Sequence, residues 1–237
     1  MAAPTHSRVL LILFDGFNTL DMNGPYEVLR KSGVRTGVKI EVAAESEITT
    51  SVEGVHVKRD IPLNDKLIES LSMYDTLVVP GGPAGKGKPV DEQAAKIKSP
   101  FMRLIKAFAE LPTTTEQYPR LLLSICTGAL FLGTLGVFNG GRICTTHWAA
   151  YDNLANRNKI SASSAGTDPG TVLKARFVDS GLNDKGIRIL SSGGISCGLD
   201  ASLYVVKLRW GEAEAIDTAS ILDLAWRKTE GVVAYEG

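Results

Sequence analysis

The stretch Leu121-Leu-Leu-Ser-Ile-Cys126-Thr127-Gly128-Ala-Leu-Phe-Leu-Gly133 decides the fold. Its apolar run, 121–125, has the length of a buried strand, and residues 129–132 begin a helical pattern. Cys126 is therefore predicted on a sharp strand-to-helix turn. A helix N-terminus favours an anion, so we expect a lowered thiol pKa and a nucleophilic sulfur. The fragment also fits an ordinary buried cysteine, since free cysteine is often buried.

Composition indicates one globular domain, residues 1–237, with 1–7 as a flexible N-terminal tail. The 237 residues are 44% hydrophobic, which is enough for a large core. Lys+Arg and Asp+Glu are both 26, with no basic stripe, so charge gives no case for a nucleic-acid or membrane partner. The apolar run 9–14 is too short to span a bilayer.

The three cysteines, Cys126, Cys144 and Cys197, are an odd set without metal-ligand spacing. This pattern favours reduced thiols in an intracellular, cytoplasmic compartment over a disulfide framework. We expect no metal site.

Apolar runs alternate with helical patterns along the chain, which predicts an α/β fold: a mostly parallel sheet with helices on both faces. Val55–Lys58 is predicted as a hairpin arm, and Pro25 as the first residue of its helix. The predicted strands are 8–14, 38–44, 75–79, 121–125, 142–146, 175–179 and 187–191. The predicted helices are 25–29, 65–72, 91–98, 101–110, 149–155, 199–210 and 212–227.

Ligands of such sheets bind beyond the carboxyl ends of the strands, which selects four loops: 15–21, 80–85, 126–128 and 191–198. Gly81 and Gly82 permit close backbone approach and expose N–H groups. They can act as oxyanion donors facing Cys126, with the Thr127 amide as partner. Alternatively, these glycines only make tight turns.

Asp21 lies between Leu20 and Met22, where an ionised side chain is costly to bury. One solution is a neutral carboxyl, its pKa raised by desolvation and by a thiolate neighbour, that acts as a general acid. The alternative is that Asp21 caps the helix beginning near Gly24.

Five motifs follow in the order seen in the DJ-1/PfpI superfamily, and together they cover roughly residues 8–226. They are Leu20-Asp-x-x-Gly-Pro-x-Glu-Val-Leu29, Val-Val-Pro-Gly-Gly82, Ile-Cys-Thr-Gly-Ala129, Thr-Thr-His-Trp148 and Ser-Gly-Gly-Ile-Ser-x-Gly-x-Asp200. The chain resembles the isonitrile hydratase branch, and also the sensor domains of AraC-type regulators. Those regulators carry a DNA-binding region after this domain. Because the printed chain stops at Gly237, we expect none here.

The resemblance implies a flavodoxin-like three-layer sandwich, a homodimer, a small-molecule substrate and no cofactor. It implies Cys126 as nucleophile, Asp21 as its acidic partner and Thr127 as the required neighbour. Backbone amides of Gly82 and Thr127 are implied near the reacting centre. The remaining residues expected around the substrate are Gly81, Gly128, His147, Trp148 and Ile195. For His147, a structural role at a strand end is the alternative.

The expected reaction is hydration of an isonitrile to an N-substituted formamide through a covalent thioimidate on Cys126, with Asp21 as general acid and base. Two alternatives stay open. One is a DJ-1-type glyoxalase or carbonyl-adduct hydrolase that uses the same cysteine. The other is a non-catalytic oxidation sensor, in which Cys126 forms a sulfinate beside Asp21.

Overall fold

The computed structural model describes residues 7–112 and 118–234. The predicted tail, 1–7, lies outside these residues except for Ser7, which already begins the first strand.

A central sheet organises the described residues, in the order β12-β10-β11-β7-β6-β1-β2-β5. All neighbouring pairs in it are parallel except β10 with β11. The carboxyl ends of β1, β6, β7 and β11 therefore meet at one edge. The strands are β1 (Ser7–Leu13), β2 (Val38–Ala44), β5 (Ile61–Pro62), β6 (Thr76–Val79), β7 (Leu121–Ser124), β10 (Phe177–Leu182), β11 (Arg188–Ser192) and β12 (Gly231–Val233).

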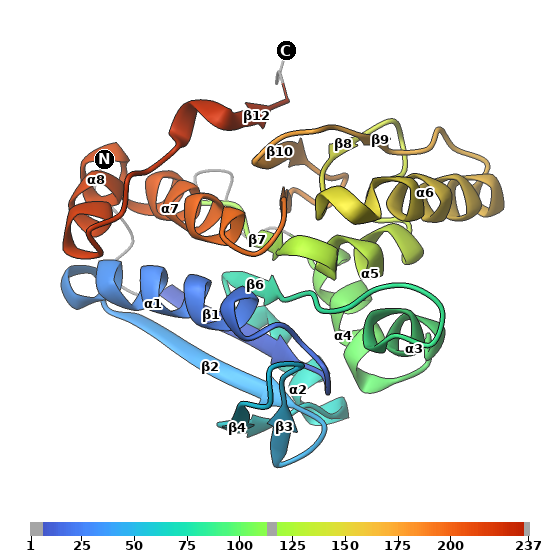
Figure 1. Cartoon of the computed structure of the whole chain (residues 1–237), viewed down its shortest axis with the longest axis horizontal. Coiled ribbons are helices and arrows are strands. Elements are labelled where there is room, and N and C mark those ends of the chain that lie inside the picture. Colours follow the sequence, from blue (N-terminus) through green and yellow to red (C-terminus); the bar gives the residue numbers. More distant parts are fainter. Residues whose placement is uncertain (1–6, 113–117, 235–237) are drawn as a thin grey trace.

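Two small pairs lie beside this sheet. The antiparallel hairpin is β3 (Ile48–Thr50) with β4 (His56–Lys58), and the parallel pair is β8 (Ile143–Cys144) with β9 (Thr171–Val172). The hairpin projects from the lower edge in Figure 1.

The helices form separate packing groups around the sheet, as Figure 1 shows. One group contains α1 (Thr19–Thr36), α7 (Cys197–Trp210) and α8 (Glu212–Ile221). On the other side, α2 (Asp65–Glu69) contacts α4 (Pro100–Ala109), while α3 (Pro89–Ala95) and α6 (Tyr151–Ala165) contact α5 (Ala129–Thr134). The α/β, flavodoxin-like prediction is confirmed. Short 3-10 turns occupy Leu71–Met73, Cys126–Gly128, Trp148–Ala150 and Lys228–Glu230.

The start of α1 corrects the prediction that Pro25 opens this helix. The Asn18 carboxamide oxygen accepts the N–H groups of Leu20 and Asp21, at 3.1 and 3.2 Å. Because Asn18 caps the helix, it begins at Thr19, and Pro25 lies inside it. Because proline has no N–H, the Asp21 carbonyl receives no helical hydrogen bond from Pro25. The helix nevertheless continues through this residue, although proline usually ends a helix.

Other boundaries also differ. The helix predicted at 149–155 runs from 151 to 165, where Gly166 ends it in a left-handed conformation. The last helix ends at Ile221 rather than 227, and the strand predicted at 142–146 is limited to 143–144. Strand β12 was not predicted, since 231–233 is a short segment that pairs at the sheet edge.

Three phenylalanines join the elements behind the carboxyl edge of the sheet. Phe14, Phe101 and Phe131 form edge-to-face pairs, with ring centroids 5.1–5.4 Å apart. They come from the end of β1, from α4 and from α5, so their packing fixes the loop after β1 against the helix that follows Cys126.

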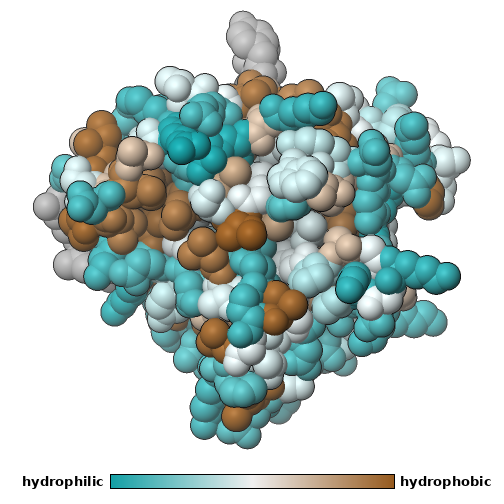
Figure 2. Space-filling view, viewed as in Figure 1, coloured by the Kyte–Doolittle hydropathy of each residue, from teal (hydrophilic) through white to brown (hydrophobic). Residues whose placement is uncertain are grey.

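The molecular surface has no continuous apolar belt on the face drawn in Figure 2, where hydrophobic patches are separated by hydrophilic residues. Across residues 7–112 and 118–234, no helix combines the length and the apolarity that a membrane crossing requires.

Replacing Phe101 with Ala is expected to lower the free energy of unfolding by about 3–5 kcal/mol, because a fully buried aromatic ring is lost from this cluster. Urea denaturation measures the change. The control, Ile160→Ala, truncates an exposed side chain on α6 and should change the free energy by about 0.5 kcal/mol at most. Equal effects of the two changes would contradict the assigned core.

Candidate functional site

Cys126 lies on the predicted strand-to-helix turn. After β7 and Ile125, its backbone has a φ of +57°, which is uncommon for a non-glycine residue. The surrounding chain holds this conformation: the Cys126 N–H donates to Gly193 O at 3.1 Å, and the Thr146 hydroxyl donates to Cys126 O at 2.8 Å. Strained backbone of this kind presents a nucleophile at the carboxyl edge of a sheet.

Glycine is required where the loop after β6 meets this turn. A Cβ added to Gly81 would lie 2.4 Å from Thr127 Oγ1, and one added to Gly128 would lie 2.4 Å from Val79 O. A Cβ added to Gly82 would lie 2.4 Å from Gly16 O. The glycines therefore serve close approach between loops.

Hydrogen bonds between these loops fix Asp21 and Thr127. Gly81 N–H donates to Asp21 Oδ2 at 3.0 Å, and Gly82 N–H donates to Thr127 Oγ1 at 2.8 Å. The Thr127 hydroxyl donates back to Gly82 O at 2.6 Å. Since both glycine N–H groups already have acceptors, their role as oxyanion donors stays a prediction.

The Asp21 carboxyl has no solvent exposure. Its Oδ1 is buried without a well-formed hydrogen bond. Burial raises the pKa of Asp21 to about 7, against the lowering effects of the Gly81 N–H and of hydrogen bonding with Cys126. The expected desolvation is confirmed, whereas the neighbouring sulfur lowers this pKa rather than raising it. Asn18 takes the capping role that was the alternative for Asp21.

The expected lowering of the Cys126 pKa is wrong. Burial, followed by the negative charge of Asp21, raises the pKa of Cys126 to about 12. Hydrogen bonds from the Ile195 and Thr127 backbone oppose this rise without reversing it. The sulfur is a thiol beside a carboxyl that is half ionised near pH 7, so Asp21 is the first of the pair to lose its proton.

A cavity of about 310 Å³ opens above the sulfur. It brings together the predicted residues Cys126, Thr127, Gly82, His147 and Ile195. The predicted residues Asp21, Gly81, Gly128 and Trp148 do not line this cavity. The Trp148 side chain is 73% exposed. The lining residues that sequence reasoning missed are Asn18, Val52, Pro83, Ala84, Ala149 and Ala150.

Some of these missed residues had a signal in the sequence. Asn18 is two residues before Leu20, in a capping position, and Pro83 and Ala84 directly follow the glycine pair. Val52 had no such signal, because it reaches the cavity from the β3–β4 hairpin, whose position depends on tertiary packing.

His147 is a neutral group at the cavity wall. Burial lowers its pKa, and its Nδ1 accepts the Ala149 N–H at 3.2 Å, which leaves the remaining ring proton on Nε2. Gly194 packs against the ring so closely that an added Cβ would lie 2.4 Å from Cδ2.

All three cysteines are free thiols, as predicted. In the described part of the chain, no three His, Cys, Asp or Glu side chains are grouped so that they could hold a metal ion.

A cysteine on a strand-to-helix turn, with a carboxyl from the first βα unit beside it, defines a class of α/β proteins with a thiol at the sheet edge. The sequence profile of the DJ-1/PfpI family matches residues 7–182, and the chain belongs to this family. Isonitrile hydratase of Pseudomonas putida is 29% identical over 219 residues, covering 92% of this chain and 76% of that protein.

Solved structures show the same fold. Drosophila melanogaster DJ-1beta superposes with a TM-score of 0.66 at 19% identity, covering 93% of this chain and all of that one. An AraC family transcriptional regulator from Pseudomonas putida has a TM-score of 0.64 at 19% identity, covering 91% of this chain and 99% of that one.

Changing Asp21 to Asn should lower the Cys126 pKa, because the neighbouring negative charge that raises it is removed while the side-chain volume stays nearly the same. The pH dependence of Cys126 alkylation by iodoacetamide, read from the Cys126 peptide by mass spectrometry, measures this change. A Cys126 pKa equal to that of the wild type would mean that the two groups are not coupled.

Proposed function

We propose that this protein hydrates isonitriles to N-substituted formamides, acting as a homodimer. One observation carries the proposal: the buried Asp21 carboxyl, with a pKa of about 7, acts on the Cys126 thiol at the cavity floor. Addition of a thiol to an isonitrile carbon needs a nucleophile and a proton donor at the same atom. A carboxyl that changes protonation near neutral pH supplies the second requirement.

In the first half-reaction the Asp21 carboxylate accepts the S–H proton as sulfur bonds to the terminal carbon of R–N≡C. Asp21 then gives this proton to the same carbon, and the product is the thioimidate R–N=CH–S–Cys126. Because the thiol pKa is high, proton removal accompanies attack instead of preceding it.

In the second half-reaction water adds to the thioimidate carbon. Asp21 accepts a proton from the water and passes it to the nitrogen. The tetrahedral adduct R–NH–CH(OH)–S–Cys126 then expels sulfur while Asp21 transfers the hydroxyl proton to it, and R–NH–CHO leaves. The net reaction is R–N≡C plus water giving the formamide, with Cys126 and Asp21 restored.

The cavity favours an uncharged substrate. Its polar side chains are Asn18, Cys126, Thr127 and neutral His147, and the described lining contains no ionised side chain. Val52, Pro83, Ala84, Ala149, Ala150 and Ile195 supply apolar surface. An isonitrile with an apolar substituent fits these walls.

A glyoxalase-type reaction remains the second candidate, since methylglyoxal is also small and uncharged and the fold is shared with DJ-1beta. The oxidation sensor is less favoured, because peroxide reacts with thiolate and the Cys126 pKa is raised to about 12.

Purified protein incubated with cyclohexyl isonitrile should release N-cyclohexylformamide, measured by gas chromatography. Cys126→Ala should reduce kcat/KM by about a thousandfold or more, because no covalent intermediate can form. Asp21→Asn should reduce it by about a hundredfold or more, because proton transfer is lost.

Cys197→Ser is the matched control, since this thiol is half-buried and outside the cavity lining, and it should keep near-wild-type turnover. Lactate from methylglyoxal without formamide would favour the second candidate. Formamide production that survives Cys126→Ala would exclude the proposed mechanism.

A further inference from the structure

Glu53 lies in the turn of the β3–β4 hairpin, yet its carboxylate binds the start of α1. It accepts the Thr19 N–H at 2.9 Å and the Thr19 hydroxyl at 2.6 Å through Oε2. Its Oε1 accepts the Asn18 side-chain amide at 2.6 Å. Desolvation raises the pKa of the exposed Glu53 carboxyl, but hydrogen bonds with Thr19 and Ser51 keep this pKa below its ordinary value, so the group is an anion at neutral pH.

The Asn18 side chain transmits this contact to Asp21. While its amide nitrogen donates to Glu53, its oxygen accepts the backbone N–H of Asp21 at 3.2 Å. The Asn18 backbone N–H donates to Gly81 O at 2.8 Å, next to the Gly81 N–H that donates to Asp21 Oδ2. Glu53 is therefore two hydrogen bonds from the Asp21 backbone N–H and three, through Asn18 and Gly81, from the Asp21 carboxyl.

The hairpin is held against the loop that precedes α1. Gly16 N–H donates to Thr50 O at 2.8 Å, and Val52 N–H donates to Phe17 O at 2.9 Å. The Thr50 N–H donates to Asp15 Oδ1 at 3.0 Å. Since Val52 lines the cavity, one hairpin both forms part of its wall and supplies the anion that caps α1.

We propose that Glu53 is a positioning residue for Asp21: from the hairpin, it caps α1 and orients Asn18, and so sets the place and the charge environment of the carboxyl beside Cys126. The role rests on the proposed function for its turnover readout only. The titration of the Asp21 carboxyl, followed by infrared difference spectroscopy, reports on the same pair whether or not an isonitrile is the substrate.

The charge of Glu53 acts in a defined direction. Among the described residues, the titratable groups that act on Asp21 are Cys126, from the turn after β7, and Glu53, from the hairpin; the Gly81 N–H is the remaining polar influence. Glu53 raises the Asp21 pKa, so neutralising Glu53 should move the first ionisation of the pair to lower pH.

Glu53→Gln removes the negative charge of residue 53 and keeps the size of its side chain. Glu53→Ala removes all the side-chain hydrogen bonds to the start of α1. Glu53→Gln should shift the titration of the Asp21 carboxyl to lower pH, measured by infrared difference spectroscopy with Asp21→Asn subtracted to assign the band. Glu53→Ala should reduce kcat for cyclohexyl isonitrile by about tenfold to a hundredfold, because Asp21 is no longer aligned. Glu53→Asp, which keeps the charge, should recover part of this loss.

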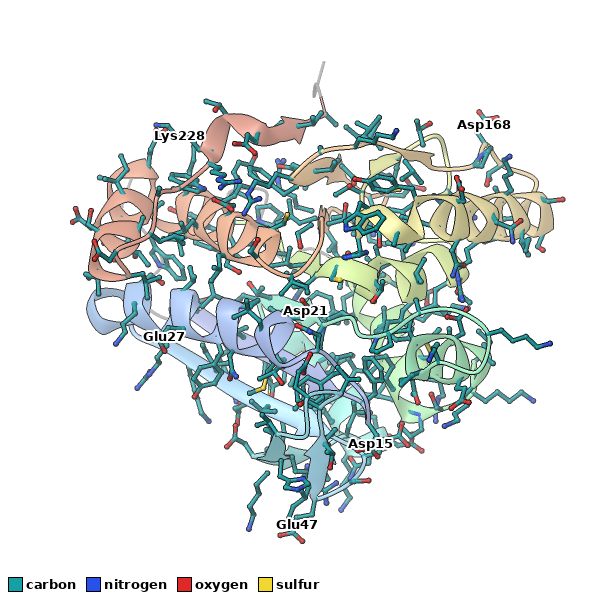
Figure 3. All side chains as sticks on the ribbon, viewed as in Figure 1. Asp15, Asp21, Glu27, Glu47, Asp168 and Lys228 are labelled. Atoms are coloured by element: carbon teal, nitrogen blue, oxygen red, sulfur yellow. The ribbon has the colours of Figure 1, made fainter. Side chains whose placement is uncertain are left out.

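Glu47→Gln is the matched control. Glu47 belongs to the same hairpin segment, but its carboxylate is exposed and pairs with Lys58 at 3.1 Å. Figure 3 shows Glu47 at the lower edge of the molecule, far from Asp21 near the centre. The control should leave both the Asp21 titration and kcat unchanged, and circular dichroism establishes that each variant is folded.

The outcomes separate the two claims. If the wild type does not turn over isonitrile but Glu53→Gln still shifts the Asp21 titration, the proposed function fails and the positioning role stands. If the Asp21 carboxyl titrates at the same pH in Glu53→Gln as in Glu47→Gln, the positioning role fails, whatever the turnover.

Discussion

The Asp21 carboxyl and the Cys126 thiol interact where both side chains are buried, and the site depends on this pair. Raising the Asp21 pKa from 3.8 to about 7 corresponds to roughly 4 kcal/mol of preference for the neutral form. This is a large part of the 5–15 kcal/mol by which a domain is usually stable. A purely structural residue at this position would gain from being apolar, so the cost of the buried carboxyl supports the chemical role that we propose for it.

Backbone contacts hold the pair in place. The Gly81 N–H fixes one carboxyl oxygen, and the Thr127 hydroxyl bonds with both the N–H and the carbonyl of Gly82. These contacts bring the two loops so close that a Cβ at position 81 or 128 would lie 2.4 Å from an atom of the facing segment. Only glycine fits at these two positions. The helix that carries Asp21 is fixed from the opposite direction by Asn18 and the hairpin. The turn after β7 thus positions the Cys126 sulfur, while α1 positions the Asp21 carboxyl.

The sequence predicted much of this arrangement. The apolar run before Cys126 and the glycines after β6 predicted a thiol at the sheet edge, and the order of strands and helices predicted the parallel sheet. The direction of the Cys126 pKa was not predictable in the same way, because the sequence shows a helix N-terminus but not the burial that outweighs it. The start of α1 was missed because Pro25 is a strong local signal, whereas the Asn18 cap overrides it. Val52 and Glu53 depend on where the hairpin packs, a long-range property that no local pattern contains.

The electrostatic coupling between Asp21 and Cys126 is tested most directly by the titration of the Asp21 carboxyl itself. Infrared difference spectra of protein with isotope-labelled aspartate, assigned by subtracting Asp21→Asn, follow this group with pH. The account predicts a carboxyl band that disappears near pH 7 and a higher pKa in Cys126→Ala, because the thiol that stabilises the carboxylate is gone. A band that titrates with the exposed carboxylates near pH 4, in both proteins, would contradict it.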